Sequence, residues 1–281
     1  GNYMKNTFAF IMIMLSCCFS FFVLACEKEN ISEQSDSLPA YLPEGMKLVW
    51  SDEFDVDGAP DSQKWDYSLG ANGWGNGEIQ KYTNTRDNSF VKDGLLNIVA
   101  INDGGMWTSA RLKTQYKASW TYGFIEVRAK LPAGVGTWPA IWMMPEFDRY
   151  GSWPRSGEID IMEHVGFEQD VIHTSIHTLD FNHKKNTQKS KFRKFDKVSK
   201  KFHTYAINWT PDYIEWFIDG ESFYKFENTG KGVAQWPFDN KFYLILNVAI
   251  GGSWGGQKGI DKKLTTPTMF VDYVRVYQLE E

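Results

Sequence analysis

The sequence predicts an all-β protein that folds as a sandwich of two antiparallel sheets with one concave face. Apolar residues recur at every second position in several segments, which is the period of a half-buried strand. Clusters of Gly, Pro, Asn and Asp separate these segments at short intervals, as in sandwiches and barrels. No segment shows a convincing helical period. After the N-terminal segment is set aside, the length suits a single all-β domain.

The clearest alternation lies in residues 123–131, where Ile125 belongs to an apolar face and Glu126 to a polar one. An apolar run with the same period ends at Asp219-Gly220, a strong signal for a two-residue β-hairpin turn. The same period predicts strands in residues 205–209, 214–218, 242–250 and 270–277.

The N-terminus has the layout of a lipoprotein export signal. Lys5 supplies a positive charge, Thr7–Ala25 contains no charged residue, and Val-Leu-Ala directly precedes Cys26. Cleavage of such a signal removes residues 1–25 and leaves Cys26 as the acylated N-terminus. The alternative is an uncleaved signal anchor, because about 18 apolar residues can span a bilayer.

A tether of residues 26–41 is expected to connect the lipid to a domain of residues 42–281. The stretch 31–43 is rich in Ser, Glu, Gln, Asp and Pro, as in flexible linkers. The processed domain contains no disulfide, zinc–cysteine cluster or cysteine nucleophile, because every cysteine lies in the signal or at its edge. These cysteines are Cys17, Cys18 and Cys26.

The composition bears on the partners of the domain. The net charge is −5 and becomes −6 when Lys5 is removed, which argues against general nucleic-acid binding. We expect a monomer that needs no cofactor for catalysis. Aromatic residues make up 16% of the chain and include 12 Trp, an excess that sugar binding would explain, since indole rings stack on the apolar faces of sugars.

One acidic segment contains Glu158, Asp160 and Glu163 with apolar residues between them. In a regular strand the first two acids share a face, but Glu163 points to the apolar side. Burying an unpaired carboxylate there costs several kcal/mol. A β-bulge at Ile161-Met162 would return Glu163 to the polar face. The sequence therefore predicts a bulged strand with three acids in one row.

Three crowded carboxylates do not all ionise readily, so their pKa values separate. A retaining glycosidase uses such a pair, with an ionised nucleophile and a protonated acid about 5–5.5 Å apart. A calcium site and a solvated acidic face are the alternatives. The flanking apolar and Trp residues argue against a solvated face, and the segment lacks the turn glycine of a calcium loop.

The acidic segment resembles the signature of glycoside hydrolase family 16, in the bulge-containing form seen in laminarinases. That resemblance implies a β-jelly-roll with a cleft across the concave sheet and a retaining mechanism. Glu158 takes the place of the nucleophile, Asp160 that of the assisting acid and Glu163 that of the acid/base. The resemblance extends to Trp50–Phe54, Tyr122–Glu126, Gly136–Pro145, Leu246–Gly252 and Val271–Tyr277.

The resemblance also implies an endo-β-glucanase that hydrolyses laminarin or mixed-linkage β-1,3/1,4-glucan. Agarases and carrageenases share the bulged motif, a transglycosylase uses the same intermediate, and a non-catalytic glycan-binding lipoprotein can use the same fold. Trp138 and Trp142 are expected as sugar platforms, and His177 near the acids. Ser253 stands where laminarinases more often have Asn. Further expected substrate-binding residues are Asn72, Trp74, Arg111, Asn247 and Trp254.

Two further expectations concern surfaces. The family often binds one structural calcium ion, here expected at Asp272 with backbone near Glu53 and Gly94. The basic stretch 184–201 is expected to be a solvated loop, with contact to an anionic polysaccharide as the alternative. The acidic residues after Cys26 resemble those of surface-displayed lipoproteins of the Bacteroidetes type, which implies an outer-membrane protein on the cell surface or the periplasmic face.

Overall fold

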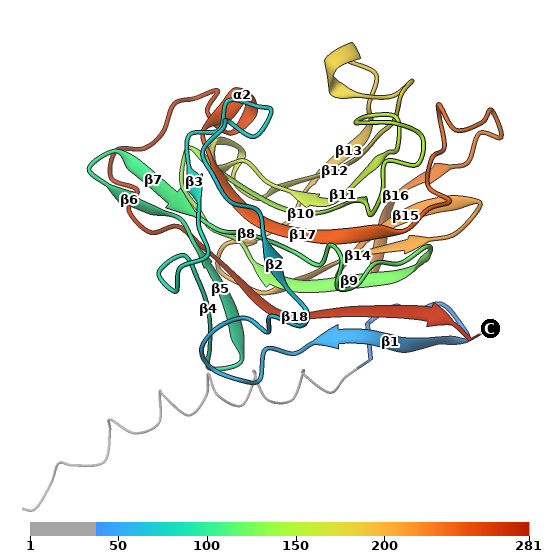
Figure 1. Cartoon of the computed structure of the whole chain (residues 1–281), viewed down its shortest axis with the longest axis horizontal. Coiled ribbons are helices and arrows are strands. Elements are labelled where there is room, and N and C mark those ends of the chain that lie inside the picture. Colours follow the sequence, from blue (N-terminus) through green and yellow to red (C-terminus); the bar gives the residue numbers. More distant parts are fainter. Residues whose placement is uncertain (1–37, 281) are drawn as a thin grey trace, which may run out of the picture. The chain divides into compact units, whose positions relative to one another are not determined.

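Two antiparallel sheets lie one above the other and form most of the fold (Figure 1). The structure is a computed structural model that describes residues 38–280. The predicted signal, the lipidated Cys26 and most of the tether lie outside the described residues. Within residues 38–280, no helix is long and apolar enough to cross a membrane.

The outer sheet has the strand order β16-β15-β14-β9-β18-β5-β4, and β1 pairs with β18 along the other part of that long strand. Its strands are β1 (Met46–Asp52), β4 (Ser89–Lys92), β5 (Leu95–Val99), β9 (Gly123–Lys130), β14 (His203–Trp209), β15 (Tyr213–Ile218), β16 (Glu221–Glu227) and β18 (Thr268–Leu279).

The cleft sheet has the order β13-β12-β11-β10-β17-β8-β2, and a small third sheet has the order β3-β7-β6. The strands of the cleft sheet are β2 (Asp66–Tyr67), β8 (Arg111–Lys113), β10 (Thr137–Pro145), β11 (Glu158–Glu163), β12 (Val171–His177), β13 (Lys189–Lys194) and β17 (Phe242–Ile250). The remaining elements are β3 (Lys81–Tyr82), β6 (Ile101–Asp103), β7 (Met106–Ser109), the 3₁₀ turns η1 (Gly166–Glu168) and η2 (His183–Lys185), and the short helix α2 (Gly252–Gly255).

The hydrophobic core fills the space between the two sheets. Ile125 and Val127 of β9 and Leu244 and Leu246 of β17 are fully buried. Burying each such side chain contributes about 1.5–3 kcal/mol, so the alternating pattern determines which face of each strand turns inward. The expected sandwich and the strands predicted around these residues are confirmed.

The turn between β15 and β16 and the last residues of the predicted tether also fit the sandwich. Asp219 and Gly220 have φ values of 51° and 77°, both positive as a type I′ hairpin turn requires. They join β15 to β16, as the sequence predicts. Tyr41, which the sequence places at the end of the tether, stacks on Phe217 of the outer sheet with ring centroids 4.4 Å apart.

Candidate active site

The predicted bulge is present in β11, which lies between β10 and β12 in the cleft sheet. Asp160 pairs with Ser175 of β12 and Glu163 pairs with His173, so three steps along β11 match two along β12. Ile161-Met162 therefore contains the extra residue. The two side chains are 2% and 0% exposed and point into the core, while the acids line the cleft.

A bulge leaves a backbone carbonyl group without its ladder partner, and two side chains donate hydrogen bonds to that group here. Thr174 Oγ1 donates a hydrogen bond to the carbonyl of Asp160 at 2.7 Å. Trp216 Nε1, from the outer sheet, donates to the same oxygen at 2.9 Å. The irregular backbone is thus held by both sheets, which fixes the positions of the acids on either side of it.

Gly157 places Glu158 at the start of β11. Its φ of +92° lies in the region that favours glycine. A Cβ atom at this position would lie 2.9 Å from atoms of both Phe238 and Pro237, so a larger residue would displace the strand. The close packing of backbone against these rings holds the end of β11 that carries Glu158.

Glu158 is surrounded by hydrogen-bond donors. Trp153 Nε1 donates to Glu158 Oε2 at 2.5 Å, and the side chain of Asp160 forms a second hydrogen bond with the carboxylate. His177 Nε2 lies 4.0 Å from Glu158 Oε1. These contacts fix the orientation of the Glu158 carboxyl group.

Asp160 follows Glu158 by two residues on β11 and is 2% exposed. Burial raises the pKa of Asp160 well above its ordinary value, and the neighbouring charge of Glu158 and the hydrogen bond to it raise that pKa further. Ser175 Oγ donates to Asp160 Oδ2 at 3.1 Å and opposes this shift only in part. Asp160 therefore keeps a proton that it can donate to Glu158.

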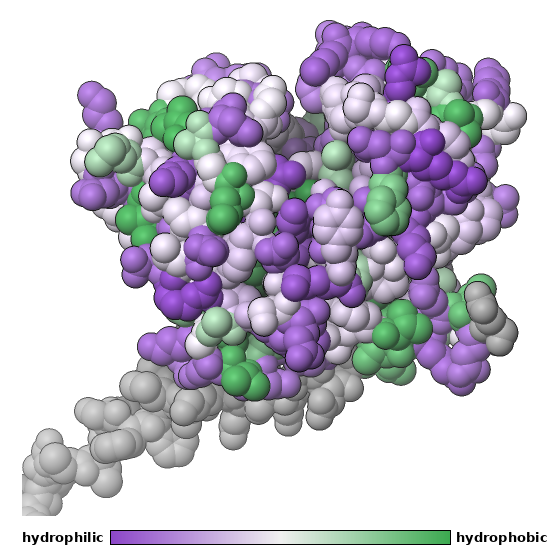
Figure 2. Space-filling model, viewed as in Figure 1, coloured by the Kyte–Doolittle hydropathy of each residue, from purple (hydrophilic) through white to green (hydrophobic). Residues whose placement is uncertain are grey.

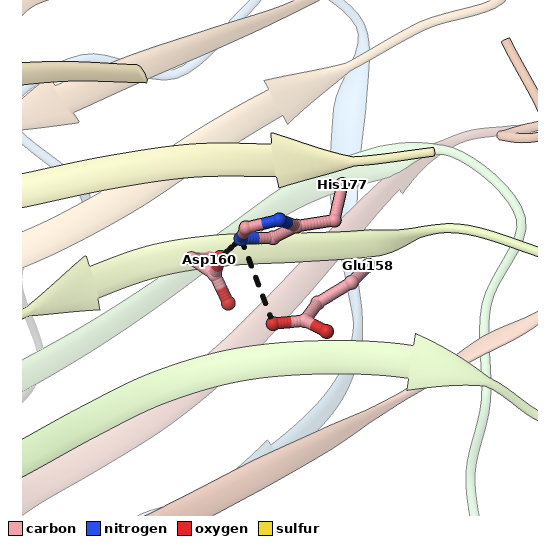
Figure 3. Close-up of side chains that lie close together, drawn as sticks. All are labelled: Glu158, Asp160 and His177. Atoms are coloured by element: carbon pink, nitrogen blue, oxygen red, sulfur yellow. Dashed lines mark ion pairs between the residues drawn. The ribbon is translucent and has the colours of Figure 1, made fainter. Parts of the chain in front are cut away.

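His177 completes this group from the neighbouring strand. Figure 3 shows its imidazole above Glu158 and Asp160, with the three side chains pointing toward one another. His177 Nε2 lies 3.1 Å from Asp160 Oδ2. Single ligand atoms of the three residues all lie within 4.8 Å of one another, a spacing that the ion pairs of His177 and the hydrogen bond between Asp160 and Glu158 already explain.

Glu163 has a different environment at the other end of the row. Burial raises the pKa of Glu163 well above its ordinary value. His177 and the hydrogen bond that Trp138 Nε1 donates to Glu163 Oε1 at 3.1 Å act in the opposite direction. Glu163 is therefore protonated under conditions in which an exposed glutamate is ionised.

The three acids lie in a cleft of about 370 Å³. Figure 2 shows the surface notched at the top of the view, between the raised part around α2 and the one above β13. Indole rings, amides and imidazoles lie around the carboxyl groups. The lining residues include Trp74, Asn76, Glu78, Arg111, Trp138, Trp142, His173, Ser175, His177, His183, Gln188, Ser190, Asn247, Ser253 and Trp254.

Comparison with known proteins places the fold and the acids in one family. Residues 50–275 match the sequence profile of the glycosyl hydrolases family 16. The chain belongs to glycosyl hydrolase family 16. A β-glucanase from Rhodothermus marinus is 49% identical over 261 residues, which cover 89% of this chain and 90% of that protein.

Solved structures of family 16 agree with this assignment. The laminarinase from Rhodothermus marinus superimposes with a TM-score of 0.81 at 50% identity, covering 84% of this chain and 98% of the other. SCLam, a non-specific endo-β-1,3(4)-glucanase, gives a TM-score of 0.82 at 44% identity and covers 86% and 95%. The resemblance to the laminarinase branch of family 16 is confirmed.

One wall of the family 16 cleft contains four of the residues predicted from the sequence. The guanidinium of Arg111 lies 4.9 Å from the ring of Trp74 and 4.7 Å from that of Trp142. Trp142 Nε1 donates to Asn247 Oδ1 at 2.7 Å, and Asn247 Nδ2 donates to the hydroxyl of Tyr82 at 3.0 Å. The two indoles are therefore held in fixed orientations before any sugar binds.

Other predicted residues have different positions. Trp138 is only 9% exposed and holds Glu163, while Trp254 packs edge-on against it with centroids 5.5 Å apart. Ser253 lines the cleft. Asn72 Oδ1 accepts a hydrogen bond from the backbone N–H of Trp74 at 3.0 Å, and its contact with substrate stays a prediction. Asn72 thus supports the loop that presents Trp74.

Several residues of the site were not assigned from the sequence. Trp153, which binds Glu158, lies in the loop before β11, and no period relates it to the acids. Glu78 reaches the cleft from another loop, and burial raises the pKa of its carboxyl to about 7 although Arg111 lowers it. The two-residue period of β12 did indicate that His173 and Ser175 line the cleft, because both share a face with His177.

At the calcium site expected around Asp272, arginine side chains pair with the carboxylates. Asp272 Oδ2 accepts a hydrogen bond from Arg128 Nη1 at 2.6 Å, and the carboxylate of Glu53 pairs with Arg275 at 2.8–2.9 Å. A guanidinium already balances each carboxylate, so these side chains do not form a vacant set of cation ligands. Calcium binding stays a prediction.

Chelation gives a direct check on calcium. A bound ion stabilises the native state by mass action, so removing it lowers the melting temperature. If calcium binds at Asp272, EDTA lowers the melting temperature of the wild-type chain and added calcium restores it, whereas Asp272→Asn shows neither response. An identical wild-type melting temperature in EDTA and in calcium contradicts the expectation.

Proposed function

We propose that this protein is a retaining endo-β-glucanase that hydrolyses β-1,3-containing glucans, either laminarin or mixed-linkage β-1,3/1,4-glucan. The observation that carries the proposal is a pair of carboxyl groups with different surroundings on one bulged strand. Glu158 accepts hydrogen bonds from Trp153 and Asp160, whereas burial keeps Glu163 protonated. Retaining glycosidases require such a pair.

In the first step, a carboxylate oxygen of Glu158 attacks the anomeric carbon of the sugar. The bond from that carbon to the glycosidic oxygen breaks, and its electron pair goes to the oxygen, which takes the proton of Glu163. Trp138 Nε1 holds the Glu163 carboxyl in place during this transfer. The products are a glycosyl ester on Glu158 and a released chain with a new hydroxyl group.

In the second step, Glu163 is ionised and acts as a base. It takes a proton from a water molecule whose oxygen attacks the anomeric carbon, and the ester bond to Glu158 breaks. The returning negative charge on Glu158 is stabilised by Trp153 Nε1 and by the proton of Asp160. Two displacements at one carbon retain its configuration.

The tryptophan-lined cleft and the described activities of the relatives support a glucan as substrate. The β-glucanase and laminarinase of Rhodothermus marinus and the endo-β-1,3(4)-glucanase SCLam all align over more than four-fifths of this chain. The fixed indoles of Trp74 and Trp142 offer apolar surfaces for pyranose rings. We propose attack within the glucan chain, as for SCLam.

Product analysis tests this proposal. The full chain is incubated side by side with laminarin, mixed-linkage glucan, agarose and carrageenan, and the released oligosaccharides are identified. We expect oligosaccharides of several lengths from one or both glucans, with the β configuration at the new reducing end before mutarotation. Cleavage of agarose or carrageenan alone, or of no polysaccharide, would contradict a glucanase.

We also propose that the protein is exported and anchored to the outer membrane through a lipid on Cys26. The charge-free segment and the small residue before Cys26 support this. Cells that express the chain are given labelled palmitate, and Cys26→Ser is the matched control. Label in the wild-type chain that is lost in the variant supports the anchor, and equal labelling of both contradicts it.

A further inference from the structure

The register of the cleft sheet aligns residues of six strands in one row that crosses the acid/base. Directly paired residues of antiparallel strands project their side chains from the same face. The row passes through Glu163 and continues on both sides of it. Its members, from β8 to β13, are Arg111, Asn247, Ala140, Glu163, His173 and Phe192.

The end of this row lies in the basic stretch, which was expected to be a solvated loop. Residues 189–194 instead form β13, the edge strand of the cleft sheet. Ser190 lines the cleft, and Phe192, two residues further, shares its face and is 68% exposed. Lys191 and Arg193 alternate with them on the opposite face, where Arg193 pairs with Glu221 of the outer sheet at 2.9 Å.

An unbroken series of ring contacts leads from the acid/base to Phe192. Trp138, which binds Glu163, packs against Trp254, and Trp254 lies perpendicular to the His173 ring at 4.7 Å. His173 in turn contacts Phe192 with centroids 5.6 Å apart. The cleft wall on this side is therefore aromatic from its centre to the edge of the sheet.

The imidazole in this series is held in place. Glu168 of η1 approaches His173 Nε2 with its Oε2 at 3.0 Å. Gly166 makes that turn possible, because a Cβ there would overlap the carbonyl of Gly134. The orientation of His173, and with it the surface next to Phe192, is thus fixed by the fold.

We propose that Phe192 is the sugar-stacking platform of an outer subsite, two strands beyond Glu163, that binds a β-glucan chain crossing β12 and β13. Strands in a sheet lie about 4.8 Å apart, so the platform lies about 10 Å from the acid/base. Single exposed apolar residues are common on protein surfaces. Phe192, by contrast, continues a wall that already lines the cleft. The proposal of this subsite rests on the proposed glucanase function.

The predicted effect depends on substrate length. Stacking so far from the reacting carbon is equally strong before and during the reaction, so its loss raises KM and leaves kcat almost unchanged. Contacts with an aromatic ring are worth a factor of about 3–10 in an equilibrium constant. Phe192→Ala should therefore lower kcat/KM about 3–10-fold on laminarin and long β-1,3-oligosaccharides. It should leave kcat/KM unchanged on oligosaccharides too short to reach β13.

Kinetics of the full chain on a series of β-1,3-oligosaccharides of increasing length test the subsite. Phe192→Tyr should restore the wild-type length dependence. Lys191→Ala changes a neighbour on the opposite face of the same strand and should have no length-dependent effect. A Phe192→Ala defect that is equal at all lengths, or absent at all lengths, overturns the outer subsite. If the wild-type chain cleaves no glucan, the glucanase proposal fails instead.

Discussion

Replacing Glu158 with Gln is expected to abolish glucan hydrolysis while leaving glucan binding intact. The amide has the shape of the carboxyl group, and its oxygen can still accept the hydrogen bond that Trp153 Nε1 donates. It cannot attack the anomeric carbon to form the glycosyl ester. We expect kcat to fall by at least about 10⁴-fold, which corresponds to about 5 kcal/mol of lost transition-state stabilisation. Single-turnover assays measure the rate of hydrolysis, and calorimetric titration with laminari-oligosaccharides measures glucan binding.

Two further variants make the assignment of the nucleophile specific. Glu158→Gly leaves space for azide, which should restore turnover of an activated aryl β-glucoside and give an α-glycosyl azide, because a single displacement inverts the carbon. Glu126→Gln is the matched control, since Glu126 is a buried glutamate of the outer sheet that accepts a hydrogen bond from Tyr273 far from the proposed chemistry. Wild-type turnover by Glu158→Gln would refute Glu158 as nucleophile.

The bulge in β11 could be predicted because it resolves a conflict within the sequence. Regular alternation would bury Glu163 beside Ile159 and Ile161, at a cost of several kcal/mol, and one extra residue removes that cost. The alternating strands of the core could be predicted for a similar reason, since a register slip of one residue would expose every apolar side chain. Strong local energies of this kind leave a visible pattern.

Contacts between loops and strands leave no such pattern. Trp153 and Glu78 reach the cleft from loops whose paths depend on the whole fold, and neither residue has a fixed spacing from the acids. Asn72 has a contact that the resemblance did not imply, because its side chain also supports the turn that presents Trp74. The edge strand β13 was missed because its charges suggested solvent, although only the alternate residues face away from the cleft.

Replacing Glu163 with Gln is expected to change both the rate and its pH dependence. In the wild-type protein, burial raises the pKa of Glu163, so the acid stays protonated at a pH where an exposed glutamate is ionised, and its proton is lost as pH rises through that raised pKa. The alkaline limb of the kcat/KM profile therefore belongs to Glu163.

Glu163→Gln should lower kcat/KM for laminarin by about 10²–10⁴-fold and remove the alkaline limb, because an amide gives no proton to the leaving oxygen at any pH. The dinitrophenolate group of a dinitrophenyl β-glucoside leaves without being protonated. The first step of the variant on this substrate should therefore approach the wild-type rate. Azide should then accelerate the second step and yield a β-glycosyl azide, since Glu158 has already inverted the carbon once. The β product from Glu163→Gln and the α product from Glu158→Gly separate the two roles. An alkaline limb that persists in Glu163→Gln would assign the proton to another group.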